Sequence, residues 1–147
     1  MSLIAQIEGD LKDAMRARDQ ERTEPLRLTL AALRSSEKEL GRALKDDEEL
    51  QVLQRERKRR TEAADAFRTG GREEQAAKEE RELALIQAYM PEPISEEELE
   101  RLIDDAIAET GATSLRDLGR VMADVMPQVA GRADGSMVSQ LVREKLA

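Results

Sequence analysis

Residues 89–98, "YMPEPISEEE", divide the chain into two helical parts. Pro91 and Pro93 cannot both continue a helix, and each disfavours helical backbone in the residue before it. Ser95 follows as a predicted N-cap, with Glu98 three residues later as its capping-box partner. The expected domains are, in chain order, residues 1–90, a proline linker at 91–94, and residues 95–147.

The part after this boundary is predicted to be a compact module of three helices. Its apolar residues recur every three or four positions, as in helices that share a core. The "TGATS" segment, residues 110–114, separates the first helix from the second, which is expected to run to Pro127. Asp134 is placed to cap the third helix. The apolar positions are Leu99, Leu102, Ile103, Ala106, Ile107, Leu115, Leu118, Val121, Met122, Val125, Met126, Met137, Val138, Leu141, Val142 and Leu146.

The part before the boundary is expected to begin with a helix over residues 2–18. A second helix is predicted with Pro25 in its first turn, and a third begins in "KDDEEL", residues 45–50. From residue 54 to residue 82 large apolar side chains are scarce, and the Gly70–Gly71 pair breaks this region into a helical hairpin. The apolar stripe of the second helix comprises Leu26, Leu30, Leu33, Leu40 and Leu44.

The composition favours helices and allows only a thin core. Leu, Ile, Val and Phe account for 31 of the 147 residues, and Phe and Tyr occur once each. Because Ala, Leu, Glu, Arg and Lys dominate, strands are not expected. The hairpin has Phe67 as its one large apolar residue, so we expect it to be largely solvated and its helices to touch through alanines and Phe67. The predicted fold class is all-α: an N-terminal helical domain with a hairpin, and a small C-terminal three-helix module.

Several classes of chemistry are excluded or unsupported. The chain has no cysteine and no histidine, which rules out disulfides, a thiol nucleophile and a zinc site of the usual kind. The phosphate-binding loop G-x-x-x-x-G-K-[ST] does not occur, and "SSEK", residues 35–38, lies inside a helix that offers no oxyanion donors. The acidic runs at 46–49 and 96–98 are interpreted as charges at helix starts. We predict no catalytic residue, metal or cofactor.

No stretch of the sequence suggests a membrane protein. No apolar run is long enough to span a bilayer, and the N-terminus lacks the pattern of a signal peptide. A cytoplasmic location is therefore expected. The net charge of −8 discourages indiscriminate binding to nucleic acid but is compatible with a local basic patch.

The densest basic run is "RERKRR", residues 55–60. It can be interpreted as a phosphate-contacting patch, because arginine and lysine displace counterions from nucleic acid. It can also be a solvated helix face, with Glu56 and Glu62 as ion-pair partners. The cations are distributed around most of the helix circumference, which favours the second interpretation. They are Arg55, Arg57, Lys58, Arg59 and Arg60.

The "GRADG" segment, residues 131–135, precedes the last predicted helix. Gly131 and Gly135 allow positive φ, and Asp134 suits the N-cap. Arg132 is expected to project beside a helix N-terminus, whose unpaired N–H groups favour an anion such as phosphate. A simple helix cap accounts for the segment equally well, so both interpretations stay open.

Longer stretches of the chain resemble one known family. "LRLTLAALRSSEKELGR", "AYMPEPISEEEL" and "GATSLRDLGRVM", followed by "GRADG", are similar to YqeY-type proteins of the GatB/YqeY family, from about Leu11 to Leu146. The resemblance implies a helical N-terminal domain and a three-helix GatB/YqeY module at the C-terminus. That module is similar to the C-terminal domain of the B subunit of glutamine-dependent aminoacyl-tRNA amidotransferase, which helps to hold the tRNA.

The resemblance thus implies a non-catalytic tRNA-binding or amidotransferase-related accessory protein. Expected partners are tRNA, bound weakly and in a salt-dependent manner, or a tRNA-amidotransferase or synthetase complex. Two departures weaken the tRNA contact: Gln128 and Ala130 stand where lysines are usual in the family, and residues 94–147 carry a net charge of −5. The implied tRNA-contacting residues are Arg116, Arg120, Gly131, Arg132, Asp134, Gly135, Arg143 and Lys145.

Two alternatives remain. The chain could be an adaptor that binds another protein through the hairpin of residues 54–82 or through the tail module. It could also take part in glutamine-dependent amide transfer, as a carbon–nitrogen ligase does, but only within a complex. The ATP-using domain and the amidase subunit of the amidotransferase have no counterpart in this sequence, so independent catalysis is not expected.

Overall fold

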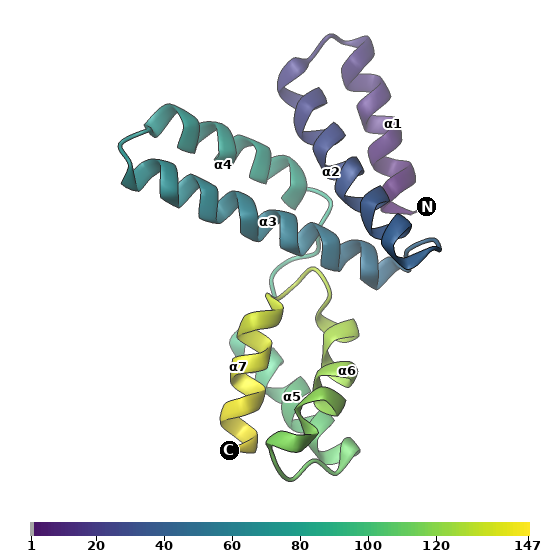
Figure 1. The fold of residues 1–147 in the computed structure, drawn as a ribbon, viewed down its shortest axis with the longest axis vertical. Coiled ribbons are helices and arrows are strands. Elements are labelled where there is room, and N and C mark those ends of the chain that lie inside the picture. The colour runs from purple at the N-terminus through teal and green to yellow at the C-terminus, as the bar shows by residue number, and fades with distance from the viewer. Residues whose placement is uncertain (1) are drawn as a thin grey trace. The chain divides into compact units, whose positions relative to one another are not determined.

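The computed structural model describes residues 2–147, and over that range its regular elements are all helices (Figure 1). The chain forms two compact units, one that ends at Pro91 and one from Glu92 to Ala147. The prediction of an all-α fold is confirmed. The elements are α1 (Leu3–Arg16), α2 (Gln20–Leu40), α3 (Asp46–Thr69) and α4 (Glu73–Gln87) in the first unit, and α5 (Glu96–Thr110), the 3₁₀ turn η1 (Leu115–Asp117), α6 (Leu118–Val129) and α7 (Gly135–Leu146) in the second.

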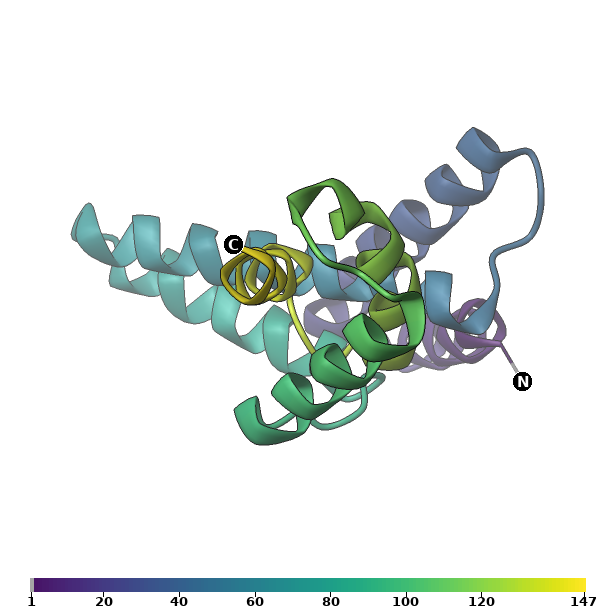
Figure 2. The ribbon, with the colours of Figure 1, turned by 90° about the horizontal axis from the view of Figure 1, so that it is seen from below.

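The first unit consists of two helical hairpins. Helix α1 packs on α2, and α3 runs side by side with α4 (Figure 1 and Figure 2). Gly71 joins α3 to α4 with a φ of +75°, a conformation that glycine adopts without steric cost, so the predicted break is confirmed. The buried apolar cluster of this unit comprises Ile7, Ala14, Leu26, Leu33, Val52, Leu53 and Ile86.

A buried carboxylate fixes the start of α1. Glu49 of α3 is 1% exposed, and its carboxylate accepts hydrogen bonds from the backbone N–H groups of Leu3 and Ile4 at 3.3 and 3.0 Å. These N–H groups have no partner within the helix, and the helix dipole also favours a negative charge there. Ser2 satisfies a further N–H group, that of Ala5, as N-cap. A side chain far along the sequence thereby sets where α1 begins against α3.

The other polar contact of α1 involves the residues that follow α4. The hydroxyl of Tyr89 donates a hydrogen bond to the Asp10 carboxylate. Burial of the phenol, together with this carboxylate, raises the pKa of Tyr89 above its usual value. The contact holds the end of α4 against the middle of α1.

Helix α2 differs from the prediction at both ends. It begins at Gln20, with Asp19 as N-cap accepting from the N–H of Arg22 at 3.3 Å, so the expectation that Pro25 lies in the first turn is wrong. Pro25 is instead buried inside the helix. Because proline has no backbone N–H, Pro25 removes one hydrogen bond near the N-terminal end of α2. The helix continues past it to Leu40. The Asp19 cap is the signal that outweighs the proline.

The C-terminal end of α2 is set by Gly41, which adopts a φ of +70° as C-cap. Leu44 therefore lies in the connection to α3 and not on the apolar stripe of α2. Leu40, the last residue of the helix, is 50% exposed. The predicted stripe is correct for Leu26 and Leu33, which are buried, and for Leu30, which packs against the same cluster. It is wrong for Leu40, while Leu44 packs against the cluster from outside the helix.

The α3–α4 hairpin contains a buried ion pair that the sequence pattern did not indicate. Ala64 and Ala76 are buried between the helices, as predicted. Beside them the Arg60 guanidinium contacts the carboxylates of Glu82 and Glu79, both from α4. Burial raises the pKa of Glu82, although the positive charge of Arg60 acts in the opposite direction. The hairpin is therefore joined by charge as well as by alanines.

The second unit is a three-helix module around one apolar cluster. Ser95 caps α5 as predicted, and Ser114 caps the η1 turn that leads into α6. Helix α6 continues past Pro127 to Val129, so the expected end at Pro127 is two residues short. The buried cluster comprises Ile94, Leu99, Ile103, Ala106, Val121, Val125, Val129, Ala133, Val138, Val142 and Leu146.

Replacement of Glu49 tests the long-range cap on α1. Glu49→Gln keeps one acceptor oxygen but removes the charge and places an NH₂ group against backbone donors. We expect the free energy of unfolding to fall by roughly 1–2 kcal/mol, as measured by urea denaturation followed by circular dichroism. Glu62→Gln, an exposed position of the same helix, is the matched control and should change it by less than about 0.5 kcal/mol. Equal effects of the two substitutions would contradict the cap.

Candidate nucleic-acid interface

The "GRADG" segment forms the connection between α6 and α7. Gly131 has a φ of +73°, which reverses the chain after α6. Asp134 is the N-cap of α7, and its side chain accepts from the N–H of Ser136 at 3.3 Å, as predicted. Gly135 does not take the positive φ that the sequence analysis allowed; it is the first residue of the helix. The segment is thus a tight turn followed by a helix cap.

Arg132 binds the start of α5 and not an external anion at α7. Its Nε donates to the carbonyl of Glu92 at 3.1 Å, and its guanidinium contacts the carboxylate of Glu98 at 3.2 and 3.5 Å. Its own carbonyl accepts from the N–H of Ile94 at 3.0 Å. The expectation that Arg132 projects beside the N-terminus of α7 is wrong, because a carboxylate of the same unit lies closer.

The same contact replaces half of the predicted capping box. The hydroxyl of Ser95 accepts from the N–H of Glu98 at 3.2 Å, which is the expected N-cap bond. The carboxylate of Glu98, however, is held by Arg132. This arginine therefore ties the segment after the prolines, the first turn of α5 and the turn before α7 into one piece.

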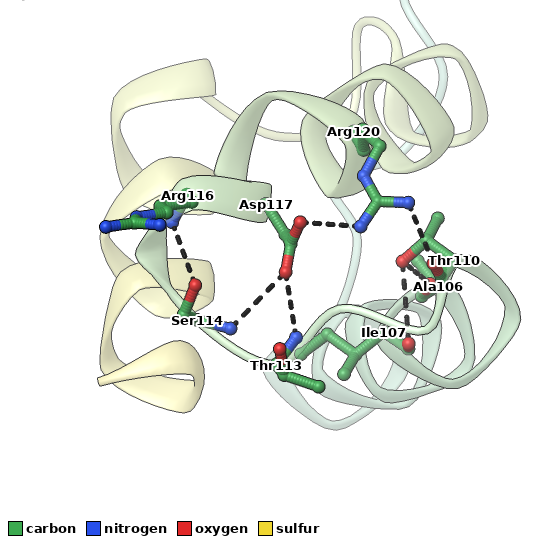
Figure 3. Close-up of polar contacts among 8 residues, drawn as sticks. All are labelled: Ala106, Ile107, Thr110, Thr113, Ser114, Arg116, Asp117 and Arg120. Atoms are coloured by element: carbon green, nitrogen blue, oxygen red, sulfur yellow. Dashed lines mark hydrogen bonds and ion pairs between the residues drawn. The ribbon is translucent and has the colours of Figure 1, made fainter.

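Arg120 is also occupied within the unit (Figure 3). Its guanidinium donates to the carbonyl of Thr110, at the end of α5, at 3.1 Å and to the carboxylate of Asp117 at 2.5 Å. Asp117 also accepts from the backbone N–H of Thr113 at 2.9 Å and from that of Ser114. These N–H groups and the Arg120 guanidinium hold the pKa of Asp117 below its usual value. The network closes the α5–α6 connection.

Two cations of the predicted site extend away from such networks. The side chain of Arg116 points away from the Asp117–Arg120 contact, and only its backbone N–H is bonded there, to Ser114 (Figure 3). The guanidinium of Arg143 is exposed and has no ion-pair partner within residues 2–147. Lys145, by contrast, pairs with Asp104 of α5 at 2.9 Å.

Arg143 ends a row of hydrogen-bonding side chains on α7. Ser136, Ser139, Gln140 and Arg143 are three or four residues apart, so they share one face of the helix. Together with Gly135 they line a shallow depression. Lys145, two residues after Arg143, is turned about 200° away around the helix and faces α5. The depression is therefore on the side of α7 that is not packed against α5.

Ser136, Ser139 and Gln140 are the residues of this surface that the sequence did not single out. The polar spacing of 136, 139, 140 and 143 is visible in the sequence. The same polar spacing occurs on any solvated helix face, so spacing alone does not identify these residues as a binding surface. The depression itself depends on how the turn before α7 folds, which the spacing does not report.

The charge of the second unit is strongly acidic. Residues 92–147 carry 6 basic and 12 acidic side chains. Arg120, Arg132 and Lys145 are each neutralised by a carboxylate of the unit. Exposed positive potential is thus confined to a few positions, among which Arg116 and Arg143 are those proposed as tRNA contacts.

The "RERKRR" run lies in the middle of α3, and its members differ in surroundings. Arg60 is 8% exposed and inside the hairpin, so it does not belong to an exposed basic patch. Arg59 is exposed and pairs with Glu56 at 3.4 Å, as the solvated-face interpretation predicted. Arg57 donates to Gln54, and Arg55 donates to Ser36 of α2 at 3.4 Å. The run faces several directions and does not form one phosphate-contacting surface.

Ser35 and Ser36 of "SSEK" lie inside α2. In the described range, 2–147, there is no group of three or more acidic side chains placed to hold a metal ion. A search of the same range for helices of the length and apolarity required to cross a membrane found none.

Comparison with known proteins identifies relatives over the whole chain and over part of it. The profile of the family described as "Yqey-like protein" matches residues 4–146. "Altered inheritance of mitochondria protein 41, mitochondrial" of Pyrenophora tritici-repentis is 28% identical over 145 residues, which cover 97% of this chain and 80% of that protein. A glutamyl-tRNA(Gln) amidotransferase subunit of Thermococcus gammatolerans is 40% identical over 57 residues, which cover 36% of this chain and 9% of that protein. Because one relative is named as mitochondrial, the cytoplasmic location stays a prediction.

The Asp117 carboxyl provides a direct test of the network at the α5–α6 connection. Its pKa should lie below the usual aspartate value in a carbon-13 NMR titration. Arg120→Gln should raise it towards, but not up to, that value, because the Thr113 N–H still donates. Since the pKa is lowered in the folded state, the stabilisation is complete above the unfolded value and is lost as the pH falls through the folded value. An Asp117 pKa that Arg120→Gln does not change would contradict the contact.

Arg132→Ala tests whether this arginine is structural. We expect faster hydrogen exchange of the Ile94 amide, measured by NMR on the full chain, because the turn that accepts its hydrogen bond loses its tie to α5. Lys145→Ala removes a different ion pair of the same unit and should leave the exchange of Ile94 unchanged. If both variants exchange like the wild type at Ile94, the guanidinium does not hold this segment.

Proposed function

Because the chain belongs to the family of Yqey-like proteins, as its sequence predicted, we propose that it is a non-catalytic accessory protein that contacts tRNA through its second unit. One relative is named as a subunit of a glutamyl-tRNA(Gln) amidotransferase, and the shared segment covers only 9% of that protein. A segment that makes up so small a share of an amidotransferase subunit is suited to an accessory role within a complex and not to the whole amide-transfer reaction. The accessory role is therefore favoured over independent amide transfer.

The observation that carries the proposal is the depression on α7. It presents hydroxyl, amide and guanidinium groups from Ser136, Ser139, Gln140 and Arg143 on one helix face, next to Gly135 at the helix start. Serine, glutamine and arginine side chains, together with helix N-termini, are the groups that proteins use to contact nucleic-acid phosphates and sugars. Such contacts position a backbone without reading its bases.

The charges limit how strong this contact is. Among the proposed tRNA contacts, Arg143 and Arg116 are the cations without a carboxylate partner in the described residues, so about two phosphates are neutralised. Binding should then weaken with salt at a slope of about −2 in a plot of log K against log salt concentration. The 12 carboxylates of the unit oppose any larger contact. We expect tRNA affinity in the micromolar range at low salt, and a complex that adds further contacts in the cell.

Arg132 and Arg120 act on this surface indirectly. Arg132 holds the turn before α7, and Arg120 closes the α5–α6 connection. Removal of Arg132 would disturb the turn before α7, and removal of Arg120 would loosen the α5–α6 connection, so a loss of tRNA binding in either variant would not identify a contact. Arg143 is the informative position, because its guanidinium has no intramolecular ion pair among the residues described.

Arg143→Ala should weaken the binding of total tRNA about threefold to tenfold at low salt, as measured by fluorescence anisotropy, and should reduce the salt slope by about 1. The matched control is Arg101→Ala, which removes one exposed cation of the same unit from α5. It should have a smaller effect. Equal effects of the two would assign the binding to overall charge, and wild-type protein that does not bind tRNA even at low salt would overturn the proposal.

A further inference from the structure

A second surface lies in the first unit, in a groove between the C-terminal half of α2 and the first half of α3. Two adjoining depressions share Ser36, Glu39, Val52 and Arg55 and so form one continuous groove. Its walls follow helical spacing, and none of the α7 residues of the second unit takes part. The remaining lining residues are Ala32, Ser35, Leu40, Leu44, Glu48, Gln51, Glu56 and Arg59.

The groove is small-walled and apolar at one end. Ala32, Ser35 and Ser36 line the α2 side, and side chains of this size let another helix approach closely. Leu40, at the end of α2, is 50% exposed and borders the groove. Val52 forms part of the floor and is buried. The small side chains of the α2 wall thus allow another helix to approach closely, and about half of the Leu40 side chain is uncovered.

Two charges in the groove lack a partner of opposite sign. Glu48 is held by a forked contact with Arg42, at 2.8 and 3.0 Å, and Glu56 pairs with Arg59. Glu39 on the α2 wall, by contrast, has no hydrogen-bond or ion-pair partner in residues 2–147. Arg55 on the α3 wall reaches only the Ser36 hydroxyl, at 3.4 Å. The groove thus carries one unpaired anion and one unpaired cation on opposite walls.

This combination does not suit a nucleic acid, because Glu39 would repel the phosphates that Arg55 attracts. It suits a partner that brings a cation and an anion in matching positions. A second copy of the same groove has both. In a two-fold symmetric contact each residue pair occurs twice, so an arrangement that brings Arg55 of one copy to Glu39 of the other forms the reverse pair as well.

We propose that this groove is the interface of a homodimer, formed by two copies of α2 and α3 that pack groove to groove. A two-fold axis near Ser36 places α2 antiparallel to α2 of the partner. Residues at equal distance from the axis then face each other, which brings Leu40 of each copy onto Ala32 of the other. The exposed leucine is covered by the smallest residue of the wall, and both unpaired charges are satisfied.

The size of the groove sets the strength of the dimer. Twelve residues line it in each copy, fewer than the 20–30 residues a side of a standard interface. The dimer should therefore be weak, with a dissociation constant in the micromolar range, and it should weaken as salt screens the two charge pairs. The proposal uses none of the residues assigned to tRNA contact and is independent of that function.

The test is sedimentation equilibrium of the full chain over a concentration range from low to high micromolar. Wild-type protein should associate to a dimer. Arg55→Glu alone and Glu39→Arg alone should each raise the dissociation constant about tenfold or more, because each places like charges opposite one another in both pairs. The variant with both substitutions restores opposite charges and should recover the dimer.

The controls make the same charge changes outside the groove. Arg72→Glu and Glu74→Arg lie at the exposed connection between α3 and α4 and should leave the dissociation constant unchanged. Circular dichroism verifies that each variant is folded. A wild type that remains monomeric at every concentration, or single variants whose loss is not reversed in the double variant, would overturn the homodimer.

Discussion

A shortage of large apolar side chains is the constraint on which this structure depends. With 31 Leu, Ile, Val and Phe residues shared between two units, each core is thin, and burial of apolar surface alone orders few of the helix ends. Charged side chains do so in its place. Glu49 accepts from the first N–H groups of α1. Arg120 donates to a carbonyl in the last turn of α5, and Arg132 donates to the carbonyl of Glu92, before α5. Because unpaired N–H and C=O groups at helix ends are costly to bury, these contacts fix where helices begin and end.

This use of charge decides which residues remain for partners. A guanidinium that already holds a carboxylate and a backbone carbonyl loses those contacts if it turns to a phosphate, so its affinity for an external anion is reduced by their free energy. Arg120 and Arg132 are in this position, although both stand in the segments that most resemble the tRNA-holding module. Arg143 is not; Ser139 and Gln140 share its helix face, and the Gln140 amide donates to the Glu144 carboxylate at 3.4 Å. The cation best able to bind is thus outside the most characteristic motif.

The sequence predicted the helices and most of the core, because these follow from local signals: helix caps and three-to-four-residue apolar spacing. It failed where a contact between distant segments outweighs a local signal. Pro25 indicated a helix start, but the Asp19 cap begins α2 earlier. Glu98 fits a capping box by spacing, yet its carboxylate binds an arginine 34 residues away. For the candidate site, the sequence identified the residues of the motif. Whether their side chains bind groups of the same unit or remain available to a partner depends on how α5, α6 and α7 pack.

The same criterion separates the two surfaces proposed for binding. On α7 Arg143 has no ion-pair partner among residues 2–147, and the Glu144 carboxylate beside it already accepts from the Gln140 amide at 3.4 Å. In the α2–α3 groove an unpaired arginine faces an unpaired glutamate, so a polyanion gains one contact and suffers one repulsion. A protein surface with both signs gains two contacts, and a second copy of the groove is the one partner that carries them by construction. The charges left unpaired after folding therefore indicate different partners for the two units, although both units are acidic overall.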